Sequence, residues 1–104
     1  MVEGTNDVKK VGKLLFGRSL RLQLALWIVH RDELTFYQSE PAAAVGVSTS
    51  NVIEELDRLA RLGMIQAVAK LAGERRQYYL RTDSPLWQVI ESAGRVAANV
   101  AVKG

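Results

Sequence analysis

The stretch SEPAAAVGVSTSNVIEELDRLARLGMI, from Ser39 to Ile65, decides the fold of this chain. It predicts two helices, Glu40–Val45 and Thr49–Leu62, because Gly46 and Gly63 stand where helices of these lengths usually end. The three residues GVS separate the two helices. Two short helices joined by such a tight turn form a helix-turn-helix. We therefore expect a helix-turn-helix over about residues 39–63.

Both helices also carry start signals. Ser39 is a candidate cap for the first helix, and Pro41 suits its first turn. Ser48 is an N-cap for the second helix, because its hydroxyl can accept a hydrogen bond from a backbone N–H of the first turn. The apolar residues expected on the inward face of the second helix are Val52, Leu56 and Leu59.

The tip of the second helix carries a run of small polar residues, which has two explanations. They could only cap the helix, or they could contact a molecule outside the protein. In a helix-turn-helix the second helix lies in the DNA major groove, where its N-terminal residues reach the base edges. Free backbone N–H groups at the tip can also hold a phosphate. We favour contact, and the residues of this helix expected to lie against DNA are Ser48, Thr49, Ser50, Asn51, Ile53 and Glu54.

The segments MIQAVAKLA and RQYYLR flank the dipeptide GE and predict a β-hairpin over about residues 64–81, with Gly73 in the turn. Arg75 and Arg76 follow the turn, and Lys70 lies on the first strand. A hairpin in this place is the wing of a winged helix-turn-helix. These three basic residues would hold the flanking DNA backbone. The alternative is a plain solvated turn, because charged hairpin tips are common.

Upstream segments complete the predicted fold. A helix is expected over about Asp7–Phe16. The next segment, SLRLQLALWIVHR (19–31), alternates like a strand, but its length and its strong helix formers favour a helix at the centre of the domain. Leu34–Tyr37 would be a short extended piece.

The last segment, DSPLWQVIESAGRVAANVAV (83–102), predicts a helix with Ser84 as its cap and Pro85 as its first residue. It carries an apolar stripe, and a 104-residue chain offers few other residues to cover it. We therefore expect the stripe to pack on a second copy of the chain. The residues of the last helix expected in this dimer interface are Leu86, Val89, Ile90, Ala93, Val96, Ala97 and Val100.

The composition excludes several classes of protein. Hydrophobic residues make up 48% of the chain and charged residues 24%, which is typical of an ordinary globular domain. The absence of cysteine excludes disulfides, thiolate metal sites and cysteine nucleophiles, and favours the cytoplasm. No apolar run approaches the length of a membrane span.

Neither a metal site nor an active site is expected. His30 is the single histidine, and no residue pair offers a nucleophile with its base, so the sequence predicts no metal, no cofactor and no enzyme. The acidic group Glu54, Glu55 and Asp57 is interpreted as a solvated helix face.

The net charge of +3 is unevenly distributed. Residues 1–22 hold five basic and two acidic side chains, and residues 66–82 hold four basic and one acidic. Two separated basic segments indicate a surface that meets an anionic partner at two places.

Three blocks in this order, LFGRSLRLQLALWIVHRDEL, AAAVGVSTSNVIEELDRLARLGMI and GERRQYYLRTDSPLWQVIE, resemble the ArsR-type winged-helix repressors and, more distantly, the MarR type. The resemblance implies a homodimer built by the first and last helices, so that Val8, Val11 and Leu15 of the first helix would join the dimer interface. It also implies repression of a promoter that an inducer relieves. Many ArsR-type proteins bind metal through a Cys-x-Cys before the recognition helix. This sequence has no cysteine there, so metal sensing of that kind is not expected.

The sequence therefore predicts a mainly α fold with a small β-hairpin wing (α+β), a winged helix-turn-helix in one domain of residues 1–104, with a dimerisation helix over about 84–102. The expected function is that of a dimeric repressor that binds double-stranded DNA, without membrane attachment and with an unidentified inducer. The alternative is a winged-helix module for protein–protein interaction that has lost DNA binding, which the acidic residues of the recognition helix favour.

Overall fold

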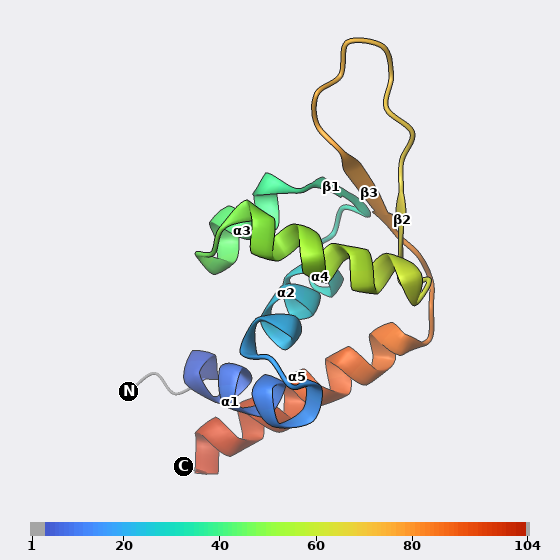
Figure 1. Ribbon diagram of the computed structural model, residues 1–104. Helices are drawn as coiled ribbons and strands as arrows, with labels where there is room; N and C mark the ends of the chain where they lie inside the picture. The colour runs from blue at the N-terminus through green and yellow to red at the C-terminus, as the bar shows by residue number, and fades with distance from the viewer. Residues whose placement is uncertain (1–3, 104) are drawn as a thin grey trace. The chain divides into compact units, whose positions relative to one another are not determined.

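The computed structural model of the chain describes the backbone of residues 4–103 and the side chains of residues 8–98. The chain forms two compact units. The first contains the helices α1 (Gly4–Phe16), α2 (Ser19–Val29) and α5 (Leu86–Lys103), and the second is formed by His30–Ser84 (Figure 1). The expectation of a single domain over residues 1–104 stays a prediction.

In the first unit, α2 packs against both α1 and α5. The expected helix over this segment is confirmed, and Leu22, Leu24, Ala25 and Ile28 are all buried on it, although they point in different directions around its axis. A helix that is apolar on more than one side is stable in water only when other elements cover it.

The close packing of α1 on α2 depends on Gly12. A Cβ atom placed on Gly12 would lie 2.9 Å from Cβ of Leu22 and 3.2 Å from the backbone oxygen of Ser19. The α1 helix ends at Gly17, which has a φ of +81° and donates to the carbonyl of Lys13. The Arg21 guanidinium donates to the Phe16 carbonyl at 2.6 Å, so the first turn of α2 satisfies the end of α1.

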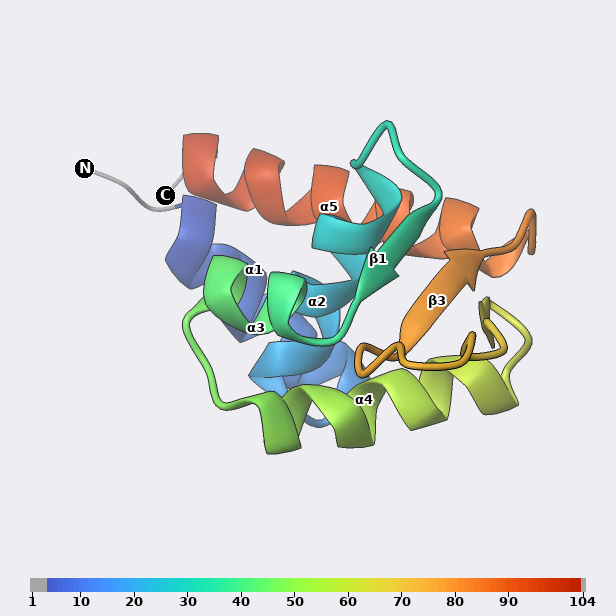
Figure 2. The ribbon, with the colours of Figure 1, turned by 90° about the horizontal axis from the view of Figure 1, so that it is seen from above.

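The second unit contains a three-stranded antiparallel sheet of β1 (Thr35–Tyr37), β2 (Ile65–Ala67) and β3 (Tyr78–Arg81). Its strand order is β1-β3-β2, and Figure 2 shows β1 beside β3. The expected extended piece at 34–37 therefore becomes an outer strand. Phe36 is buried on it and stacks on Tyr79, with ring centroids 5.7 Å apart.

The helix-turn-helix of the second unit consists of α3 (Ser39–Val45) and α4 (Thr49–Arg61). Gly46 adopts a φ of +75°, and its N–H and that of Val47 both donate to the carbonyl of Ala42. Glycine has no Cβ to oppose this left-handed conformation, which turns the chain from α3 into α4. Val52 and Leu56 are fully buried on α4, as the pattern predicted.

The start of α3 differs from the prediction. Ser39 lies inside the helix, and Gln38 precedes it without a capping hydrogen bond from its side chain. The N–H of Tyr37 instead donates to the Glu40 carboxylate at 2.9 Å, so an acidic residue of the first turn closes this end. The predicted fold class is confirmed: the chain is mainly helical with a small antiparallel sheet, a winged helix.

Candidate nucleic-acid interface

Ser48 caps the helix α4. It has extended backbone angles, and its hydroxyl accepts a hydrogen bond from the N–H of Asn51 at 3.3 Å. The hydroxyls of Ser48 and Ser50 also lie 3.2 Å apart. The capping prediction for Ser48 is therefore confirmed, and its contact with DNA stays a prediction.

The other residues at the tip of α4 are open to solvent. Thr49, Ser50, Asn51, Ile53 and Glu54 are all exposed. The hydroxyl of Thr49 forms no hydrogen bond with any residue that the structure describes. The first two turns of α4 thus present polar groups and one aliphatic side chain to solvent. Side chains of these kinds can contact base edges and thymine methyl groups.

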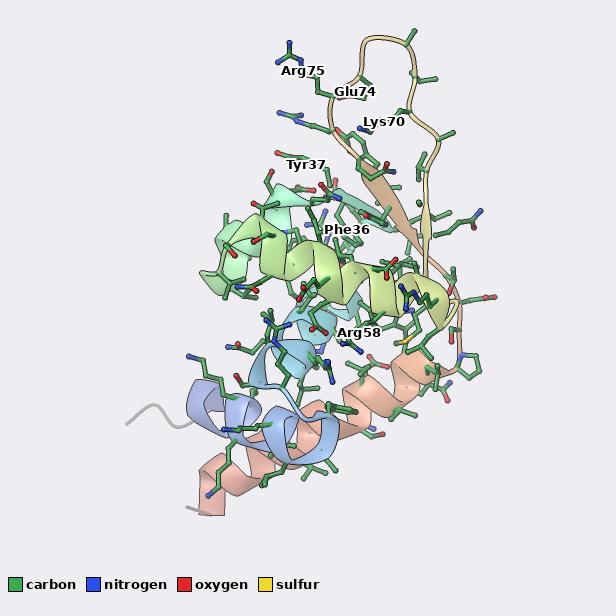
Figure 3. The ribbon with its side chains drawn as sticks, in the orientation of Figure 1. Phe36, Tyr37, Arg58, Lys70, Glu74 and Arg75 are labelled. Atoms are coloured by element: carbon green, nitrogen blue, oxygen red, sulfur yellow. The ribbon has the colours of Figure 1, made fainter. Side chains whose placement is uncertain are left out.

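The sequence predicted that the acidic group on α4 is a solvated face, and this prediction is wrong for one of its three residues. Glu54 and Asp57 are exposed, but Glu55 is only 3% exposed. Arg58 lies 3.9 Å from the Glu55 carboxylate, and Arg61 pairs with Asp57 at 2.7 Å (Figure 3 labels Arg58). These pairs offset part of the negative charge that α4 would bring toward a phosphate backbone.

The burial of Glu55 could have been found from its spacing. It lies three residues after the buried Val52 and four before the half-buried Leu59. Residues at such spacing share one face of a helix. The charge of the residue concealed this position, because acidic side chains are seldom fully buried unless they are paired.

The wing is a hairpin whose paired part is shorter than predicted. β2 and β3 pair over Ile65–Ala67, and residues 68–77 form the loop beyond them, with Gly73 at a φ of +84°. Side chains tie this loop to itself. Gln77 donates to the carbonyl of Val68 at 2.9 Å, and the Lys70 ammonium donates to the carbonyl of Arg75 at 3.3 Å.

The three basic residues predicted for the wing differ in their surroundings. The Arg75 side chain points away from the loop (Figure 3), and its guanidinium has no partner among the residues that the structure describes. Lys70 is engaged across the loop. The guanidinium carbon of Arg76 lies 4.4 Å from the centre of the Tyr37 ring, and a hydrogen bond with Tyr78 raises the pKa of Arg76 above its ordinary value.

The residues predicted for a dimer interface differ in their burial. Ile90, Ala93 and Ala97 are buried within the chain, so the expectation that they lack an internal partner is wrong. They lie at helical spacing around Gly94, where the side chain of Leu26 on α2 packs closely. The exposed residues of the predicted set are Leu86, Val89 and Val96 on α5 and Leu15 on α1.

Three further members of that set have other surroundings. Val8 and Val11 are half-buried on α1, and the side chain of Val100 lies outside the described residues. The dimer interface itself stays a prediction.

The described residues form neither a metal site nor a membrane span. Within the described side chains, no three acidic or histidine residues come together as a group that could hold a metal ion. The described helices include none with the length and apolar character needed to cross a membrane.

Comparison with known proteins locates the fold. No family model matches the sequence, and no curated protein sequence does. The solved structure of wild-type MarR from E. coli in its apo form is similar, with a TM-score of 0.70 at 13% identity over 96% of this chain and 71% of that one. The S. aureus MepR–DNA complex has a TM-score of 0.71 at 16% identity, over 97% of this chain and 75% of MepR. AbfR bound to DNA has a TM-score of 0.63 at 14% identity, over 92% of this chain and 68% of AbfR.

These neighbours are of the MarR type, which the sequence resembled more distantly than the ArsR type. They support the winged-helix part of the resemblance and give no support to the ArsR-type assignment. The chain has the winged-helix fold of the MarR-type structures.

Proposed function

We propose that this protein is a transcriptional regulator that binds double-stranded DNA in a sequence-specific manner. The observation that carries the proposal is the exposed polar tip of α4. It belongs to the same compact unit as the hairpin that carries Arg75, whose guanidinium has no partner within the described part of the chain. The α4 tip would enter the major groove, where Thr49, Ser50 and Asn51 would lie at base edges. Arg75 would contact a phosphate beside this groove.

The structural neighbours support this reading of the fold. MepR and AbfR have been solved bound to DNA, and this chain shares their winged-helix fold. The helix α4 has 13 residues, so its first turn offers backbone N–H groups and a dipole that favour a phosphate.

The regulator would act as a homodimer. Val89 and Val96 are 52% and 53% exposed on α5, and Leu86 and Leu15 are exposed as well. Aliphatic side chains at this exposure gain from burial on a second copy. A two-fold dimer places two recognition helices on half-sites about one helical turn apart, so the operator should be pseudo-palindromic. A repressor role would follow, because a dimer seated on a promoter excludes other proteins from it.

Selection from a pool of random duplexes tests the proposal directly. The purified protein should enrich one sequence, with two half-sites in inverted orientation and a spacing near one turn of DNA. Enrichment of a single, unsymmetric half-site would contradict the dimer. A pool that stays random through repeated rounds would contradict sequence-specific recognition.

One observation favours a second function, a winged-helix module for protein–protein interaction. Glu54 and Asp57 are exposed on α4, and acidic side chains repel phosphates. Retention on immobilised generic duplex DNA separates the two functions. A DNA-binding protein is retained at low salt and released as salt rises, whereas the interaction module passes through at every salt concentration.

A further inference from the structure

Arg76 contacts a strand that lies outside the wing hairpin. Its guanidinium carbon is 4.4 Å from the centre of the Tyr37 ring, and Tyr37 belongs to β1. Tyr37 pairs in register with Tyr78, whose ring lies edge-on to it with centroids 5.5 Å apart. A guanidinium within about 6 Å of a tyrosine ring is attracted to the negative face of that ring. The three side chains therefore form one cluster, the Tyr37–Arg76–Tyr78 cluster.

This cluster differs from the other contacts of the wing loop. Lys70 and Gln77 donate to carbonyls of the hairpin itself, and the Glu74 carboxylate accepts from the N–H of Arg76 at 2.9 Å. Those bonds hold the loop in its own shape. The Arg76 guanidinium instead joins the loop to β1, so it influences the direction in which the loop leaves the sheet.

Arg75 and Arg76 are neighbours in sequence but face different surroundings. Arg75 points away from the loop, where a phosphate could approach it (Figure 3). The guanidinium of Arg76 is instead held against the Tyr37 ring and Tyr78, which restricts the directions from which a phosphate could approach it. Since both side chains are charged at neutral pH, their contacts and not their charges separate their roles.

We propose that Arg76 is a positioning residue of the wing: its guanidinium stays on the Tyr37 ring and directs the loop, while Arg75 makes the phosphate contact. The part that concerns Arg75 rests on the proposed DNA-binding function. The part that concerns Arg76 and Tyr37 is a property of the free protein and holds without DNA.

Hydrogen exchange of the free protein tests the positioning role. Tyr37→Leu removes the ring, Arg76→Gln removes the charge, and Arg75→Gln is the matched control at the neighbouring position. The first two variants should speed exchange of the wing-loop amides by about two- to fivefold, which is the range expected for an exposed cation–π contact. Arg75→Gln and the conservative Tyr37→Phe should exchange like the wild type.

The double variant Tyr37→Leu with Arg76→Gln sharpens this test, because residues that act through one contact have non-additive effects. Its loop amides should exchange no faster than those of either single variant. Amides of α4 report whether each variant is folded, and the exposed Arg76→Gln carries the test if Tyr37→Leu unfolds. Wing exchange in Arg76→Gln equal to the wild type would overturn the positioning role.

Binding to a random duplex over a range of salt tests the division of roles. Arg75→Gln should flatten the slope of log affinity against log salt by about 0.9 for each lost phosphate contact, and therefore by about 1.8 for a dimer that carries the variant in both protomers. Arg76→Gln should keep the slope and weaken binding by about two- to fivefold at every salt concentration. An equal loss of slope in both variants would overturn the assignment. A wild type that binds no DNA would defeat the proposed function, and the exchange result would still decide the role of Arg76.

Discussion

Replacement of Ser48 and of Thr49 separates helix capping from DNA contact at two adjacent positions. Ser48 accepts a hydrogen bond from the N–H of Asn51, whereas the Thr49 hydroxyl has no partner among the described residues. Loss of an N-cap hydroxyl costs about 1 kcal/mol of stability. In a domain of this size, such a loss lowers the Tm by about 4–8 °C. Thr49→Ala removes an exposed methyl and hydroxyl, and should change the free energy of unfolding by less than about 0.5 kcal/mol.

The affinity for DNA should instead fall more in Thr49→Ala than in a variant that loses only the cap. Against a duplex enriched by the wild type from a random pool, Thr49→Ala should lose about 1–3 kcal/mol of binding free energy for each half-site, which is the usual cost of one lost base contact. On random duplex it should bind like the wild type. Ser48→Asn keeps a capping side chain and should keep the wild-type Tm, so it is the matched control.

The two measurements are thermal unfolding and fluorescence anisotropy of labelled duplexes. An unchanged Tm for Ser48→Ala would refute the capping assignment. Undiminished preference of Thr49→Ala for the enriched duplex would refute the placement of this side chain at a base edge.

Three further predictions concern packing, assembly and metals. Gly12→Ala should destabilise the first unit more than Gly94→Ala. The Cβ added at position 12 would meet Cβ of Leu22 at 2.9 Å and a backbone oxygen, whereas the Cβ added at position 94 would meet the flexible end of the Leu26 side chain. Chemical denaturation of both variants measures the difference in stability, and equal stability would contradict this prediction. Val89→Glu and Val96→Glu should shift a dimer to monomer in sedimentation at micromolar concentration, because both side chains are exposed; a wild type that is already monomeric would contradict the dimer. Elemental analysis of the purified protein should find no stoichiometric zinc, since the chain has no cysteine and one histidine, and tightly bound zinc would contradict this expectation.

The helices could be predicted because their limits depend on local residues. Gly46 and Gly63 have φ values of +75° and +77°, and both follow helices whose ends the sequence predicted within one residue. Ser48 was likewise predictable as an N-cap, since a capping hydroxyl bonds to the N–H three residues ahead. Each of these features involves contacts over a few residues of chain.

Three of the features that were missed depend on residues far apart in sequence. The pairing of β1 with β3 joins Thr35 to Leu80, and no short window of sequence contains both. The contact of Arg76 with Tyr37 depends on that pairing, so neither residue alone signals it. The cover over Ile90 and its neighbours likewise depends on how helices pack, which periodicity does not specify.

The measurement that tests the central claim most directly is the affinity of the wild type for generic duplex DNA as a function of salt. A winged-helix regulator that contacts phosphates should bind at low salt, and log affinity should fall linearly with log salt by about 0.9 for each contacted phosphate. A dimer with one Arg75 contact from each protomer should therefore give a slope of about −2 or steeper. Absence of binding at low salt, or an affinity that does not change with salt, would contradict the account and favour the protein-interaction module.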